Sequence, residues 1–145
     1  MGFDEMLGAF RISGTGMRAE RQRMEVISNN IANANSTRTP EGGAYRRKEV
    51  VFEAVLKEAA GQDMQRAHHL GGVRSLGVVE DLTEQPKVYN PGHPDADADG
   101  FVTMPNVNLP LEMVNLVTAT RAYEANLRVA NSFQSMAEQS FQLLK

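Results

Sequence analysis

The chain of 145 residues contains no cysteine and no tryptophan, and aromatic residues make up only 6% of it. Without cysteine it can form neither a disulfide framework nor a thiolate site, which suits a protein that meets both reducing and oxidising surroundings. Its eight methionines and few aromatic side chains predict a flexible core. The length allows one domain, or one domain with an appendage.

Excess positive charge is also lacking, since the formal net charge is −3. Arg46, Arg47 and Lys48 are too few and too local to form a nucleic-acid footprint, so we expect no nucleic-acid partner. No apolar run reaches membrane-spanning length, which predicts a protein that is not membrane-inserted. The first ten residues carry Asp4 and Glu5 where a secretory signal has basic residues, so we expect no cleaved signal.

The stretch from Ser28 to Phe52 changes from a helical pattern to an extended one. Short amide side chains compete for backbone hydrogen bonds and therefore stop a helix. In this stretch they are Asn29, Asn30, Asn33 and Asn35. The following segment, residues 39–43 with Pro40, predicts a turn, and residues 45–52 have the β-branched and aromatic content of a strand.

The chain before this stretch has an imperfect heptad seam, which predicts a long helix that packs on another helix. The seam residues are Phe10, Met17, Met24, Ile27 and Ile31, interrupted by Ser13 and Glu20. Gly14 and Gly16 lower helix propensity by about 1 kcal/mol each. Two interpretations stay open: the helix is kinked or begins only after residue 16, or the glycines allow another backbone to approach closely.

The last third of the chain predicts a second long helix. Asn108 is a suitable N-cap, Pro110 fits the first turn, and Glu112 places negative charge at the positive end of the helix dipole. Its apolar residues follow two lines around the helix: Met113, Leu116, Tyr123, Leu127, Phe141 and Leu144 on one, and Val129, Phe133 and Met136 on the other. One partner helix cannot cover both lines, so we expect self-association or partner subunits.

The predicted fold class is mainly α with a small β region. Residues 1–36 and 109–145 would form terminal helices paired as an antiparallel coiled coil, and residues 37–108 a β-rich middle domain with extended loops. Val73, Val78, Val79 and Val88 favour an antiparallel meander of two to four strands.

One loop carries residues typical of a metal site. Asp95, Asp97 and Asp99 precede Gly100, as in the first half of a calcium loop, but Asn106 stands where a bidentate Glu is required. Such aspartates also form Asx turns. His93 has no partner set for zinc, and no nucleophile lies in a catalytic motif, so we expect no cofactor, no metal and no enzymatic activity. A calcium-responsive binding module remains the alternative from another class, although it leaves both helical seams unexplained.

Three segments together resemble the proximal rod proteins of the bacterial flagellum, in the family of rod and hook axial proteins. The first is ISGTGMRAERQRMEVISNNIANANSTRTPEGGAYRRKEVVF, the second YNPGHPDADADGFVTMPNVN, and the third EMVNLVTATRAYEANLRVANSFQSM. The motif SNNIANANST alone indicates only the axial class. The combination with TPEGGAYRR, HPDADADG and PNVN is specific to the proximal rod, and a distal rod or hook protein would need a longer middle domain.

The resemblance implies a structural subunit that polymerises helically through its terminal helices. It would form part of the drive shaft that crosses the periplasm, after export by the flagellar type III apparatus. The implied partners are copies of itself, the rod proteins FlgB, FlgF and FlgG, the rod adaptor FliE, the membrane ring protein FliF and the P ring.

Overall fold

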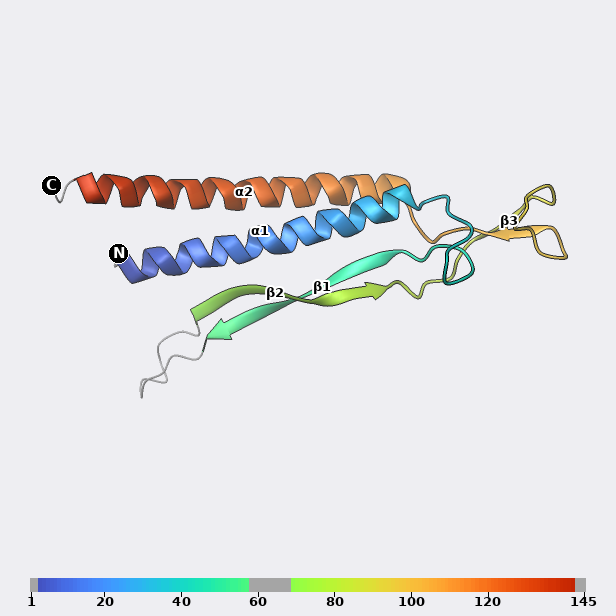
Figure 1. Ribbon diagram of the computed structural model, residues 1–145, viewed down its shortest axis with the longest axis horizontal. Coiled ribbons are helices and arrows are strands. Elements are labelled where there is room, and N and C mark those ends of the chain that lie inside the picture. The colour runs from blue at the N-terminus through green and yellow to red at the C-terminus, as the bar shows by residue number, and fades with distance from the viewer. Residues whose placement is uncertain (1–2, 58–68, 143–145) are drawn as a thin grey trace. The chain divides into compact units, whose positions relative to one another are not determined.

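The computed structural model of the protein describes residues 3–57 and 69–142, in two long helices and four strands (Figure 1). The elements are α1 (Phe3–Ala32), β1 (Lys48–Lys57), β2 (His69–Glu80), β3 (Lys87–Tyr89), β4 (Phe101–Thr103) and α2 (Leu109–Gln142). The predicted fold class, mainly α with a small β region in the middle of the chain, is confirmed.

Helix α1 runs through both glycines and ends where the asparagines begin to bond locally. It begins at Phe3, so the interpretation that the helix begins after residue 16 is wrong. At its end the Asn33 side chain donates to the Asn29 carbonyl at 2.9 Å, and the Asn33 backbone N–H donates to the same oxygen at 3.1 Å. The Ala34 N–H then bonds to the Ile31 carbonyl at 3.3 Å, three residues back, which closes the last turn.

Helix α2 begins at the predicted cap. The Leu111 N–H donates to Asn108 Oδ1 at 3.1 Å, and the Glu112 N–H donates to the Asn108 carbonyl at 2.9 Å. Asn108 therefore satisfies two of the amide groups at the start of the helix. Neither helix, within the residues described, is long and apolar enough to cross a membrane.

The strands form two separate two-stranded sheets instead of one meander. β1 pairs with β2, and their arrows point in opposite directions (Figure 1). β3 pairs with β4 in antiparallel register, with Val88 opposite Val102 and Tyr89 opposite Phe101. The rings of Tyr89 and Phe101 meet edge to face with their centroids 5.3 Å apart, an arrangement that aromatic pairs prefer.

The chain divides into two compact units, and each contains part of both helices. The first unit comprises residues 1–22, 51–77 and 119–145, and the second comprises residues 23–50 and 78–118. The start of α1 thus belongs with the end of α2, and the end of α1 with the start of α2, so the helices pair in antiparallel fashion. The division into a helical domain (1–36 with 109–145) and a middle domain (37–108) stays a prediction.

Candidate functional site

The second unit contains a buried polar junction centred on Asn30, near the end of α1. The Asn30 side chain has no exposed surface, and both ends of its amide are hydrogen-bonded. Its Nδ2 donates to the Lys48 carbonyl at 2.8 Å and to Glu112 Oε2 at 3.0 Å. Its Oδ1 accepts from the Tyr45 hydroxyl at 2.9 Å and from the Lys48 N–H at 2.9 Å. One amide therefore joins α1 to β1 and to α2.

Glu112 of α2 is the charged centre of this polar junction. It is fully buried, and its Oε1 accepts from Arg47 Nε at 2.8 Å while Oε2 accepts from Asn30. Because a buried carboxylate is costly unless it is paired and hydrogen-bonded, these two partners are what allow Glu112 to be buried. The sequence predicted that Glu112 interacts with the dipole of α2. In the structure Glu112 also accepts hydrogen bonds from Asn30 and Arg47.

The charge of Glu112 also shifts the pKa values of its neighbours. Burial raises the pKa of Tyr45 above its ordinary value, and the negative charges of Glu112 and Glu80 raise it further. For Arg47, burial lowers the pKa, but the hydrogen bonds and charges of Glu112 and Glu49 outweigh burial, so the pKa is raised. At neutral pH Tyr45 therefore stays neutral and Arg47 stays charged, so both side chains remain hydrogen-bond donors in the polar junction.

Asn106 extends the polar junction to the turn at residues 81–83. Its Oδ1 accepts from the Arg47 N–H at 2.8 Å, and its Nδ2 donates to the Asp81 carbonyl at 3.1 Å and to Thr83 Oγ1 at 3.0 Å. Arg47 Nη1 lies 3.4 Å from Asp81 Oδ2. In the sequence, Asn106 stands where a calcium loop would require a Glu. In the structure its side chain is hydrogen-bonded to this turn and stabilises it.

The aspartate loop is held by its own hydrogen bonds. Asp97 Oδ1 accepts from the N–H of Asp99 at 3.0 Å and of Phe101 at 2.8 Å, which is the Asx-turn geometry. Asp95 Oδ2 accepts from the Thr37 hydroxyl at 2.8 Å, and the Asp95 N–H donates to His93 Nδ1 at 3.1 Å. Among the residues that the structure describes, no three or more His, Cys, Asp or Glu side chains are grouped to hold a metal ion.

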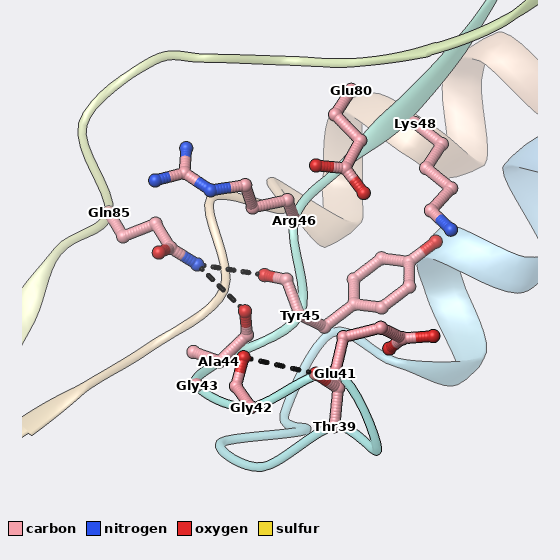
Figure 2. Close-up of a pocket in the computed structure, with 10 residues that line it drawn as sticks. All are labelled: Thr39, Glu41, Gly42, Gly43, Ala44, Tyr45, Arg46, Lys48, Glu80 and Gln85. Carbon is pink, nitrogen blue, oxygen red and sulfur yellow. Dashed lines mark hydrogen bonds between the residues drawn. The ribbon is translucent and has the colours of Figure 1, made fainter.

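A polar hollow of about 310 Å³ lies beside the turn that contains Pro40, next to Tyr45 (Figure 2). Gln85 Nε2 donates to the carbonyls of Ala44 at 3.2 Å and Tyr45 at 2.9 Å, and the Thr39 hydroxyl donates to the Gly42 carbonyl at 3.3 Å (Figure 2). The charged side chains that line it are Glu41, Arg46, Lys48 and Glu80. The lining therefore combines charges of both signs with backbone carbonyls that are hydrogen-bonded within the site.

The structure distributes the predicted seam residues over three environments. Ile27 is buried. Eight others are partly buried: Gly14, Gly16, Met17, Met24, Ile31, Leu116, Tyr123 and Phe133. Five are exposed: Phe10, Met113, Leu127, Val129 and Met136. Leu144 and the side chain of Phe141 lie outside what the structure describes. The remaining motif residues, Asn29, Asn33, Asn35, Pro40 and Asn108, lie at helix ends or in the following turn.

The two glycines of α1 differ in their surroundings. A Cβ atom added to Gly16 would lie 3.0 Å from Nδ2 of Asn126 in α2, whereas one added to Gly14 would meet no atom within 4 Å. The close-approach interpretation therefore fits the geometry of Gly16 and does not fit that of Gly14.

Helix α2 carries a large share of the exposed apolar side chains. Met113 is 52% exposed, Val114 61% and Val117 52%. Further exposed apolar side chains of the same helix are Leu109, Leu111, Leu127, Val129 and Met136. A helix gains most of its stability by burying apolar side chains, so apolar residues exposed along much of its length indicate contact with a partner. We call these eight residues, which lie on more than one side of the helix, the α2 apolar row.

Sequence reasoning missed the polar junction of Tyr45, Arg47 and Glu112. Their partners are separated by 15 to 82 positions in the chain, so no local period reveals them. The available signal was Glu112 itself, an acidic side chain between the apolar residues Leu111 and Met113, with basic residues before the first strand.

Two family descriptions match the chain. Residues 10–38 match "Flagella basal body rod protein", and residues 98–143 match "Flagellar basal body rod FlgEFG protein C-terminal". The first segment covers most of α1 and the loop after it, and the second covers β4, the loop that follows it and α2. The class that they define is that of the rod proteins of the flagellar basal body.

Individual relatives identify one family within this class of rod proteins. The chain is 42% identical to the flagellar basal-body rod protein FlgC of Salmonella typhimurium, over 90% of this chain and 92% of that protein. It is 38% identical to FlgC of Borreliella burgdorferi over 97% and 98% of the two chains, and 34% identical to FlgC of Bacillus subtilis over 94% and 97%. The chain belongs to the FlgC family of flagellar basal-body rod proteins. It is a structural, non-enzymatic protein of the flagellar basal body, and it assembles with other rod proteins.

Proposed function

We propose that the chain polymerises helically through α1 and α2 into the proximal rod, the part of the drive shaft that crosses the periplasm. The observation that supports this proposal most is the α2 apolar row, whose side chains are exposed in the single chain. A heterologous contact between copies, in which two different surfaces meet, builds a helical filament when its rotation does not close into a ring.

The proposed neighbours follow from the same position in the flagellum. They are further copies of the chain, the rod proteins FlgB, FlgF and FlgG, the adaptor FliE, the membrane ring protein FliF and the surrounding P ring. Export through the flagellar type III apparatus is part of this proposal.

The test is complementation of a strain from which the gene is deleted. Wild-type chain should restore motility and be recovered in isolated basal bodies. Val114→Asp places a charge in the α2 apolar row and should lower the amount of chain in basal bodies by tenfold or more, on the order of 1.4 kcal/mol. Val114→Ile keeps the apolar character and is the matched control. Normal motility of the Val114→Asp strain would contradict assembly through this surface.

A further inference from the structure

The turn at residues 81–83 exposes a leucine to solvent on a backbone that hydrogen bonds hold in place. Leu82 is 82% exposed, the largest value among the exposed apolar side chains of the described residues. Asp81 Oδ1 accepts from the N–H of Thr83 at 2.9 Å and from its hydroxyl at 2.5 Å. The Asp81 N–H donates to the Arg47 carbonyl at 2.8 Å.

Further hydrogen bonds connect this turn to the buried polar junction. Asn106 bonds to both residues that flank Leu82, and Arg47 joins Asp81 to the buried Glu112. Single exposed leucines are ordinary, but here hydrogen bonds fix the residues on both sides of Leu82. A side chain held on a fixed backbone loses less entropy on binding, which is the property of an interface anchor.

The first unit carries a groove whose chemistry complements this turn. The groove has a volume of about 390 Å³ and lies between α1 and the β1–β2 sheet. Its lining includes Ala19, Val55 and Val73, with Arg18 and Arg74 as its charged residues. Arg74 is already ion-paired with Glu53, at 2.7 Å. Arg18 is exposed and forms no ion pair with any described residue. The hydroxyl of Ser75, which also lines the groove, is buried without a hydrogen-bond partner among the described residues.

We propose that the turn of residues 80–84 in one copy of the chain docks into this groove of a second copy. Leu82 would cover Ala19, Val55 and Val73, and the exposed carboxylate of Glu84 would face the guanidinium of Arg18. A second copy is the occupant that the charges favour, because Glu80 and Glu84 of the turn are exposed and Arg18 of the groove has no ion pair among the described residues. The inference rests on the proposed function and specifies one contact within the helical assembly.

Site-specific photo-crosslinking in isolated basal bodies tests the contact. A benzoylphenylalanine group at position 82 should yield an adduct of twice the chain mass, with its crosslinked peptide in residues 15–22 or 71–75 of the second copy. The same group at position 41, in an exposed turn of the same unit, is the control and should not yield that peptide. An adduct with a different rod protein, or no adduct at position 82, would overturn the proposal.

Charge reversal provides a second measurement. Arg18→Glu and Glu84→Arg should each lower the amount of chain in basal bodies by about tenfold, and the double variant should recover most of it. A double variant as deficient as the single ones contradicts the docking contact. The wild-type chain tests the proposed function separately. If the wild-type chain is recovered in basal bodies but the charge-reversed variants do not behave as expected, only the docking contact fails. If the wild-type chain is not recovered, the proposed function fails.

Discussion

At the scale of single residues, Glu112 is the side chain on which the second unit depends most. Glu112→Ala would remove the acceptor of Arg47 Nε and one of the two acceptors of the buried Asn30 Nδ2. Breaking a buried pair in this way costs about 3–5 kcal/mol in the free energy of unfolding. Glu49→Ala is the matched control, because it removes the exposed partner of the same Arg47 and should cost less than about 1 kcal/mol. Urea unfolding of the purified chain, followed by circular dichroism, measures both, and equal losses would contradict the importance of the buried pair.

Asp81 provides a pH-dependent prediction at the same scale. Hydrogen bonds from the Thr83 hydroxyl and N–H, together with the charge of Arg47, lower its pKa below the ordinary value of 3.8. Because the folded pKa is the lower one, the contribution of Asp81 to stability is complete above about pH 4 and is lost as the pH falls through the folded pKa. Carbon-detected NMR titration should show this low pKa, and Thr83→Val should raise it toward the ordinary value. A pKa that Thr83→Val leaves unchanged would show that the Thr83 hydroxyl does not cause the shift.

At the scale of elements, the pairing of α1 with α2 in the first unit depends on Gly16. A larger side chain there must displace Asn126, whereas Gly14 has open space. We expect Gly16→Leu to lower the amount of chain in basal bodies severalfold at unchanged expression. Gly14→Leu, the matched control two residues away, should have little effect on assembly and should raise helix propensity by about 1 kcal/mol. Equal effects of the two substitutions would show that the contact with Asn126 does not matter.

The helices and strands also show which parts of the fold can be predicted from local sequence patterns. The heptad seam, the asparagines after Ser28 and the cap Asn108 predicted both helices and their inner ends, because capping and periodicity are properties of neighbouring residues. The extent of β2 was not predicted, since Gly71, Gly72 and Gly77 resemble turns in the sequence. Gly72 has a positive φ of 112°, and any side chain there would clash with Thr15 of α1. The need for glycine at position 72 comes from a contact with a residue far away in the chain, so no pattern among its sequence neighbours predicts it.

At the scale of the whole molecule, the chain covers little apolar surface by itself. Seven apolar residues are buried within the described part, three of them alanines, while twenty large apolar side chains are exposed. Helices gain most of their stability in proteins by burying an apolar face. Our central claim is therefore that neighbouring subunits cover the α2 apolar row, and that α1 and α2 need this cover to be stable along their full length.

An electron cryo-microscopy map of intact basal bodies, at a resolution that shows side chains, tests this claim most directly. We predict that the chain lies in the rod and that neighbouring subunits bury Met113, Val114 and Val117. We also predict that α1 and α2 are continuous in the assembled state. Density for the chain outside the rod, or an α2 apolar row that faces solvent in the rod, would contradict the claim.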